Sequence, residues 1–264
     1  MLDSLSQTLH IILGDGQVTL ARSQGWPKRR AQRLDERSPE AGETGEANLL
    51  AMLDSMLEAA HVDPAPVCVA LADDQVRTWL VEPTATARSW QDCQAVVAMR
   101  FNVVYDESPD DWQLSSVQCL DQPYLAFGVR RSLIGTLQQV LLKHRLALRS
   151  VQPESAMLWN YWHRSLGADA WFGICRGESL TLGLVYQSGL RALRPLVLSV
   201  ADREDHGWLT QTVAREAARM SMPPPATLAL CGQAPAEWLN GERGTRCVRL
   251  GSIASGLALS GDLA

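Results

Sequence analysis

The chain has little of the chemistry that marks a nucleic-acid-binding protein. Only two of its 24 basic residues are lysines, and its formal net charge is −5. Such a charge disfavours a nucleic-acid partner, because binding to phosphates requires a basic surface. We therefore expect no nucleic acid among its ligands.

Cysteine and histidine also lack a metal-binding or redox pattern. The six cysteines include no Cys-x-x-Cys pair, and the five histidines are scattered along the chain. Zinc sites and redox pairs depend on such close spacings. The sequence therefore predicts no metal site and no disulfide, and it indicates a reducing compartment.

Long apolar segments are missing as well. No stretch reaches the roughly 18 consecutive apolar residues of a membrane-spanning helix, and the first residues do not resemble a signal peptide. We expect a cytoplasmic protein. Its 46% hydrophobic and 20% charged residues are typical of a globular chain that buries a sizeable core.

What the sequence does contain is an α/β pattern that occurs twice. The first copy predicts a hairpin, a helix and a buried strand, at residues 8–25, 47–60 and 67–71. The second copy predicts a strand meander, a helix and a buried strand, at residues 170–196, 205–220 and 227–232. This order indicates a duplicated α/β unit.

Residues 76–129 have no counterpart in the second half. They predict a strand, a helix and two further strands, at 76–83, 89–101, 112–120 and 123–129. We interpret this stretch as a small subdomain inserted into the first copy. The expected domains are therefore residues 1–165, which include the insert, and residues 166–264.

A charged segment without apolar periodicity, residues 26–46, follows the first hairpin. Its composition predicts a mobile surface loop. Its basic cluster of Lys28, Arg29, Arg30 and Arg33 leaves contact with acidic lipid head groups as an alternative.

Two stretches carry a resemblance to a known family. They are VCVALADDQVRTWLVEPTATARSWQDCQAVVAMRFNVVYDE (67–107) and AFGVRRSLIGTLQQVLLKHRLALRSVQPESAMLWNYW (126–162). With them the chain resembles PilM of type IV pilus assembly and the cytoplasmic domain of GspL of type II secretion. The small-residue ending, residues 252–264, is similar to that of PilM.

The resemblance implies an α/β, actin-like fold made of two duplicated ribonuclease H-like lobes. The insert would lie in the first lobe. The second lobe would be reduced, with the missing part between residues 195 and 226.

In actin-like ATPases, two hairpins and a glycine turn after a late strand hold the magnesium nucleotide. The positions that the resemblance implies here are Gly14, Asp15, Gly16, Asp169, Gly173 and Gly232. The pattern is incomplete, because Asp15 sits within the turn, Trp171 and Phe172 crowd the second hairpin, and a single glycine follows the late strand. Asp-Gly is also a common structural hairpin turn. We therefore expect a degenerate nucleotide site and no cofactor, with ATP and magnesium as the alternative.

The resemblance implies a non-catalytic scaffold at the cytoplasmic face of the inner membrane. It would dock the cytoplasmic tail of a bitopic inner-membrane protein, PilN-like or GspM-like. The assembly ATPase is a further expected partner, and a homodimer is left open.

In PilM-like proteins the partner's tail lies in a groove beside the insert. The candidates to line that groove here are Trp79, Trp90, Val97, Phe101 and Trp112. Exposed tryptophans favour an interface, whereas core packing is the competing interpretation for each of them. Of these five, Trp90, Val97 and Phe101 are expected on the inner face of the helix at 89–101.

Two other classes of function stay open at this point. One is an actin-like nucleotide-binding protein or ATPase with a functional cleft. The other is an α/β enzyme of a different fold, which would need converging carboxylates or histidines that the sequence does not show.

Overall fold

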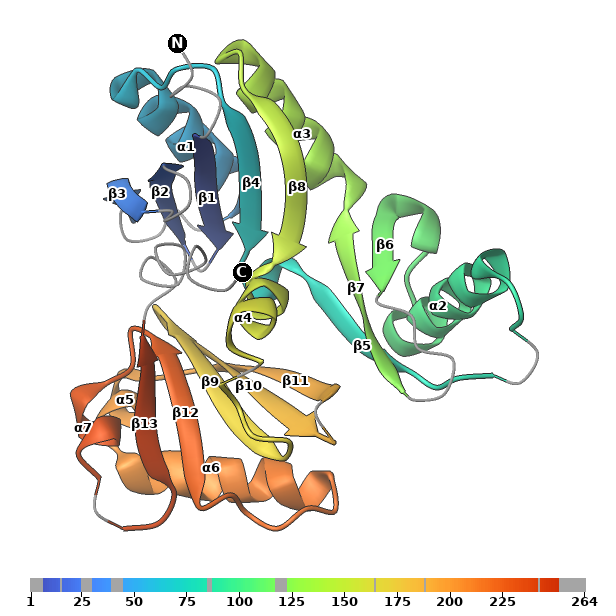
Figure 1. Ribbon diagram of the computed structural model, residues 1–264, viewed down its shortest axis with the longest axis vertical. Helices are drawn as coiled ribbons and strands as arrows, with labels where there is room; N and C mark the ends of the chain where they lie inside the picture. Colours follow the sequence, from blue (N-terminus) through green and yellow to red (C-terminus); the bar gives the residue numbers. More distant parts are fainter. Residues whose placement is uncertain are drawn as a thin grey trace. The chain divides into compact units, whose positions relative to one another are not determined.

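The computed structural model describes residues 7–14, 16–24, 30–38, 45–84, 87–116, 123–163, 165–187, 189–241 and 243–251. The chain divides into two compact units between Met157 and Leu158, within helix α4 (Glu154–Trp162). Each unit is built on a mixed sheet of five strands (Figure 1). The described residues include no helix with both the length and the apolar character needed to cross a bilayer.

The first unit contains the sheet of order β3-β2-β1-β4-β8. Its strands are β1 (Thr8–Gly14), β2 (Gln17–Gln24), β3 (Arg30–Arg37), β4 (Pro66–Leu71) and β8 (Ala147–Pro153). β1, β2 and β3 pair antiparallel, whereas β4 runs parallel to both β1 and β8. The carboxyl ends of β1, β4 and β8 therefore meet at one edge of this sheet.

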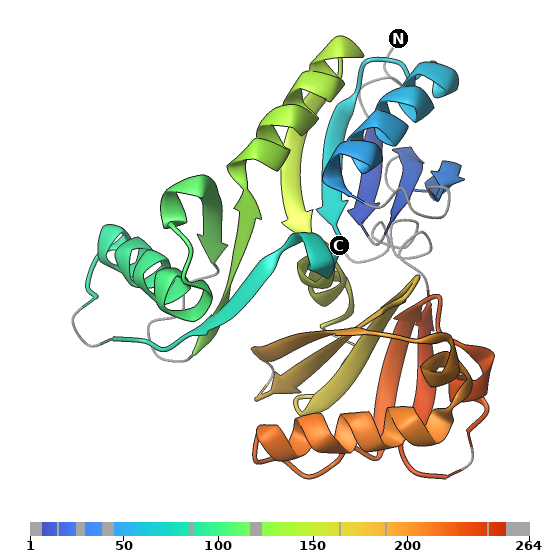
Figure 2. The ribbon, with the colours of Figure 1, turned by 180° about the vertical axis from the view of Figure 1, so that it is seen from behind.

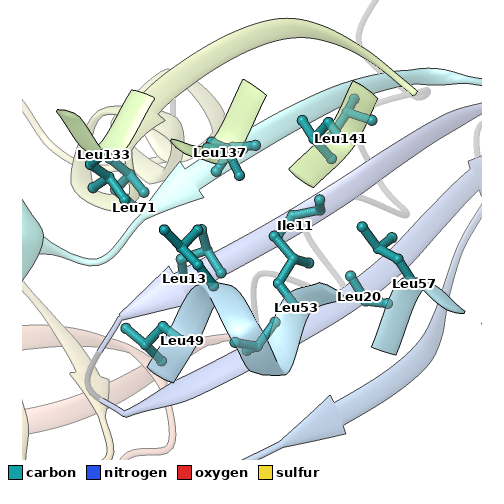
Figure 3. Packing of buried hydrophobic residues seen from close by; sticks show 14 of the residues in the cluster. Ile11, Leu13, Leu20, Leu49, Leu53, Leu57, Leu71, Leu133, Leu137 and Leu141 are labelled. Atoms are coloured by element: carbon teal, nitrogen blue, oxygen red, sulfur yellow. The ribbon is translucent and has the colours of Figure 1, made fainter. Parts of the chain in front are cut away.

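Helices α1 (Glu46–Ala60) and α3 (Arg131–Lys143) cover the same face of the first sheet (Figure 2). Leucines spaced four residues apart place an apolar stripe on each helix. These are Leu49, Leu53 and Leu57 on α1, and Leu133, Leu137 and Leu141 on α3. Figure 3 shows both stripes packed over Ile11 and Leu13 of β1 and Leu71 of β4.

Strand β3 contradicts the expectation of a mobile loop over residues 26–46. It pairs with β2 along its length, with Val18 opposite Arg37 and Gln24 opposite Arg30. Leu34 is its one large apolar residue and packs against the core. Residues 32, 33 and 35–37 of β3 are polar, which an edge strand tolerates because its backbone hydrogen bonds to β2 hold it in the sheet. Residues 26–29 and 39–44 of the expected loop lie outside the described residues.

The insert is a three-stranded antiparallel sheet of order β5-β7-β6 with one helix on it (Figure 1). It comprises β5 (Arg77–Val81), α2 (Trp90–Tyr105), β6 (Trp112–Ser116) and β7 (Tyr124–Arg130), with short 3-10 turns at Asp73–Gln75 and Pro109–Asp111. Helix α2 begins with a capping box between Ser89 and Asp92. It ends four residues later than expected, at Tyr105, and the positive φ of the following residue, Asp106, closes the last turn.

The core of the insert is aromatic. The rings of Trp79 and Trp112 lie 5.1 and 5.4 Å from the ring of Phe101, measured between centroids. Tyr105 completes the cluster, and its hydroxyl donates to the Thr78 carbonyl oxygen at 2.6 Å. The insert therefore has a small hydrophobic core of its own.

The second unit repeats the sheet arrangement of the first, with order β11-β10-β9-β12-β13. Its strands are β9 (Ala170–Arg176), β10 (Ser179–Tyr186), β11 (Gly189–Val197), β12 (Thr227–Gly232) and β13 (Arg246–Gly251). Its helices are α5 (Val200–Glu204), α6 (His206–Arg219) and α7 (Ala236–Leu239). The apolar face of α6, with Leu209, Val213 and Ala217, packs on the sheet.

The shortened part of the second unit is not where the sequence analysis placed it. Residues 195–226 carry the end of β11, α5 and α6, which match β3 and α1 of the first unit. The reduction lies between β12 and β13, which are joined only by α7. At the equivalent point, between β4 and β8, the first unit carries the whole insert and α3.

Candidate functional site

The first predicted nucleotide hairpin is a two-residue turn. Gly14 pairs with Gln17, and Gly16 has a φ of 67°, as a type I′ turn requires. Asp15 lies outside the described residues. A Cβ on Gly14 would lie 2.3 Å from the Cβ of Ala72, so the glycine is needed for close packing against the end of β4.

The second predicted hairpin turns at Gly177, between β9 and β10, as the sequence predicts, and Asp169 lies at the other end of β9. Asp169 precedes β9, so the seven-residue strand puts it about 20 Å from that turn. Its carboxylate accepts a hydrogen bond from the backbone N–H of Gln187 at 3.0 Å. Asp169 thus stabilises the turn between β10 and β11 through this hydrogen bond.

Gly173 faces the hydrophobic core of the second unit. A Cβ there would lie 2.7 Å from Leu230 and 3.0 Å from Leu180. On the other face of the sheet, the ring of Phe172 occupies the space over Gly183, where a Cβ would come within 2.1 Å of it. Gly173 and Gly183 therefore make room for side chains.

Gly232 ends β12 with a φ of 81°. A Cβ at this position would lie 2.2 Å from the carbonyl oxygen of Cys175. That oxygen accepts the backbone N–H of Gln233 at 2.8 Å. Gly232 consequently allows β12 to approach β9 closely at the end of the parallel pair.

A polar cluster that the sequence analysis missed lies at the carboxyl ends of β4 and β8. The Ser155 hydroxyl donates to the Asp73 carboxylate at 2.6 Å, and Glu154 beside it is also buried. In open α/β sheets, ligands bind at the carboxyl ends of parallel strands. The signal available in the sequence was the position of Asp73 and Glu154 directly after two strands.

The insert, the ends of α1 and α3 and the turn after β4 line an open cavity of about 160 Å³. Four charged side chains line it, together with Gln75, Val76, Trp112 and Leu133. The four are Glu46, Asp74, Arg77 and Arg130. The cavity lies at the start of α1, the start of β5 and the end of β7, within the first unit.

Two arginines are stacked on the aromatic wall of this cavity. The guanidinium carbons of Arg77 and Arg130 lie 5.7 and 4.9 Å from the ring centroid of Trp112. Glu107 binds Arg77 at 3.0 Å and lies 3.9 Å from Arg130. Cation–π contacts and the shared carboxylate thus hold both planar cations in place.

The five predicted partner-binding residues do not form one surface, because four of them are buried and one is exposed. Trp79, Val97, Phe101 and Trp112 are buried in the core of the insert. Trp90, which was expected on the inner face of α2, is 62% exposed because it opens the helix beyond the edge of that core. Trp112 alone of the five reaches the cavity.

The arginines of the cavity were missed because periodicity arguments follow apolar residues. Arg77 begins β5 and Arg130 ends β7, and the antiparallel register brings these two strand ends together, with Arg77 opposite Gly128. The sequence offered only one signal for this pair of arginines: one stands at the start of a predicted strand and the other at the end of a later one.

The buried thiols of the second unit are unsuited to nucleophilic chemistry. Burial raises the pKa of Cys175 to about 12 and that of Cys247 to about 11. A thiol with such a pKa carries almost no thiolate at neutral pH. Within the part of the chain that the structure covers, no three histidine, cysteine or acidic side chains gather as a metal ion would require.

The two related sheets, each with a hairpin meander, a covering helix and a parallel strand, define the actin-like fold class. No protein-family model matches the chain, and no curated protein matches its sequence. Solved structures do match. A Bacteroides thetaiotaomicron protein of actin-like ATPase fold and unknown function is 12% identical, with a TM-score of 0.64 over 93% of this chain and 91% of that chain.

Two further structures are of the kind expected from the sequence. A chain of the PilM–PilN type IV pilus biogenesis complex is 17% identical, with a TM-score of 0.69 over 96% of this chain and 98% of that chain. The cytoplasmic domain of EpsL, an inner membrane component of the type II secretion system of Vibrio cholerae, is 13% identical, with a TM-score of 0.60 over 98% and 95%. The predicted likeness to PilM and GspL is therefore confirmed at the level of the fold.

Proposed function

We propose that this chain is a non-catalytic scaffold of a type IV pilus or type II secretion-like assembly machine. In this role it docks the cytoplasmic tail of a PilN-like or GspM-like inner-membrane protein and works at the cytoplasmic face of that membrane. The proposal is supported by a fold shared along nearly the full length of both chains with a protein of the PilM–PilN complex. The likeness to the EpsL cytoplasmic domain supports the same setting.

The observation that carries the non-catalytic part is the packing around the predicted phosphate glycines. A phosphate cradle needs backbone N–H groups that are open to the ligand. Here Gly173 is covered by leucines, and Gly232 lies against the backbone of β9. These glycines have structural reasons to be glycine, and none of those reasons involves a phosphate.

We place the docking site at the cavity between the insert and the ends of α1 and α3. It combines an aromatic wall, apolar contacts from Val76 and Leu133, and charged groups of both signs. Partner segments bind where an apolar pocket holds an anchor side chain and polar groups fix its orientation.

Calorimetric titration tests the docking. The probe is the synthetic cytoplasmic tail of the bitopic membrane protein whose gene neighbours that of this chain. We expect saturable binding that is lost in the Gln75→Trp variant, which puts a large ring at a partly exposed position lining the cavity. Leu142→Trp, at an exposed position on α3 outside the cavity, is the matched control and should bind as the wild type does. Absence of binding to the wild-type protein contradicts the proposal.

An actin-like nucleotide binder is the second candidate, and the buried cluster of Asp73, Glu154 and Ser155 favours it. Carboxylates at strand ends are suited to placing magnesium or water beside a phosphate. Thermal unfolding with and without Mg-ATP separates the two candidates. A nucleotide at 100 times its Kd would stabilise the protein by about 2.7 kcal/mol, whereas the scaffold proposal expects no shift.

A further inference from the structure

The cavity beside Trp112 has two chemically different walls. Glu46 and Asp74 contribute carboxylates from the start of α1 and the turn after β4, whereas Arg77 and Arg130 contribute guanidinium groups from the insert. Its volume of about 160 Å³ is close to that of cavities which admit one benzene-sized group. The cavity is therefore of a size to take one side chain of a partner.

The guanidinium wall is held in place before any partner arrives. Arg77 lies over the ring of Tyr105, at 5.2 Å, as well as over that of Trp112. Arg130 lies over Trp112 while its side chain stays 52% exposed. Groups fixed in this way lose little conformational freedom when they bind a ligand.

The two guanidinium groups of this wall also have N–H donors that Glu107 does not engage. One carboxylate, that of Glu107, serves both arginines, and its 3.9 Å distance to Arg130 exceeds a hydrogen bond. The Nε of Arg77 is buried and has no hydrogen-bond partner among the described residues. That buried atom is out of reach of a ligand, whereas the Arg130 guanidinium is 52% exposed and is open to an acceptor that a ligand supplies.

We propose that the cavity binds an acidic side chain of the docked tail, with its carboxylate held by Arg77 and Arg130. This inference rests on the proposed function and names the residue type that the site recognises. Guanidinium and carboxylate groups match in shape and form paired, charge-assisted hydrogen bonds. Glu46 and Asp74 on the opposite wall repel a second acid and offer acceptors for main-chain N–H groups of the tail.

The experiment is a double-mutant cycle between the two chains, read by fluorescence anisotropy. The probe is the labelled cytoplasmic tail defined above, with each of its acidic residues exchanged in turn for the corresponding amide. We expect one exchange to weaken binding about 10- to 100-fold. Arg77→Gln and Arg130→Gln should weaken the unmodified tail by a similar factor and should no longer distinguish the acid from the amide.

Arg131→Gln is the matched control. Arg131 neighbours Arg130 in sequence, yet it is exposed and donates to the Asp110 carbonyl oxygen and the Gln113 side chain rather than lining the cavity. This variant should bind the tail as the wild type does. Because Arg77 also packs on the aromatic core, the partly exposed Arg130 gives the deciding variant if Arg77→Gln unfolds the insert.

Four results overturn the inference. If no acid-to-amide exchange weakens binding, or if Arg130→Gln binds as tightly as the wild type, the acidic anchor is wrong while docking itself stands. If a basic residue of the tail proves to be the sensitive one, the opposite wall of the cavity is the anchor site. A tail that does not bind the wild-type protein overturns both the docking and the anchor.

Discussion

The two five-stranded sheets share one strand order but differ at equivalent positions of their hairpins. Four residues from each turn, the first sheet pairs His10 with Ala21, whereas the second pairs Phe172 with Gly183. In the second sheet the phenylalanine ring lies across the glycine. The same strand order therefore accommodates a histidine–alanine pair in the first sheet and a phenylalanine–glycine pair in the second.

The copies also differ in what joins their two parallel strands. β4 and β8 are linked through the insert and α3, whereas β12 and β13 are linked through α7 alone. The cavity with the stacked arginines exists only in the copy that carries the insert. This difference teaches that the duplicated sheets supply the framework, while the proposed docking site comes from the segment added to one of them.

The largest expected effect tests whether the insert is a separate packing unit. Phe101→Ala should destabilise the insert by about 3–5 kcal/mol, because it opens a cavity between Trp79 and Trp112. Hydrogen exchange should report lost protection in β5, β6 and β7, with β1 and β9 unchanged. The control is Val103→Ala on the exposed side of the same helix. Equal loss in all three sheets would contradict an independent core.

The next effect concerns the Phe172–Gly183 pair. Gly183→Ala should destabilise the protein by about 1–3 kcal/mol, because its Cβ overlaps the Phe172 ring. The double variant with Phe172→His recreates the pair of the first sheet and should recover most of that loss in urea unfolding. Gly189→Ala, whose nearest neighbours are 3.7 Å away, is the control. Without recovery in the double variant, the two positions are not equivalent.

A smaller effect of opposite sign is expected in α3, the helix that only the first unit possesses. Gly135 lies within this helix, and no atom lies within 4 Å of the position its Cβ would take. Gly135→Ala should therefore stabilise the protein by about 0.5–1 kcal/mol through helix propensity. Urea unfolding measures this, and a destabilised variant would mean that the glycine has a packing role.

The smallest effect is a pH-dependent one at the contact between α1 and α3. The Asp54 carboxylate lies 2.7 Å from both Lys143 Nζ and His144 Nε2. The hydrogen bond from Lys143, followed by that from His144, lowers the pKa of Asp54 below its ordinary 3.8. A lowered pKa stabilises the folded state above the unfolded-state value, and this contribution is lost as the pH falls through the folded-state value.

Asp54→Asn should accordingly lower the urea midpoint slightly at pH 6, and the two proteins should converge well below pH 3.8. Asp63→Asn, an exposed carboxylate in the loop after α1, is the control and should not change the midpoint. A difference between wild type and Asp54→Asn that persists in acid would assign the effect to packing instead of charge.

The elements with strong apolar periodicity were predictable from the sequence. α1, β4, α6 and β12 appear within a residue or two of their expected bounds, because buried stripes and buried strands leave a clear pattern. β3 was missed because an edge strand needs little apolar surface. α7 and β13 were missed because the former is only four residues long and the latter, RCVRLG, has neither a continuous apolar run nor a strict alternation.

The candidate site was less accessible to sequence reasoning. The glycines of the expected nucleotide loops were visible, but the face to which each one points depends on the register of the strands. Gly173, for example, points to the core because its neighbour Phe172 points away from it. Arg77 and Arg130 come together only through pairing between strands that are distant in sequence, and a single sequence does not reveal that pairing.

The insert enters and leaves the first unit through paired strands. Arg77 lies opposite Gly128, so the two strands that carry the chain in and out run side by side, about 5 Å apart. A cut at these two points, closed by a short linker from Val76 to Val129, would excise the insert without rethreading the parent sheet. If the proposed docking site is correct, gain or loss of this one segment would change what the protein binds while leaving the parent sheet intact.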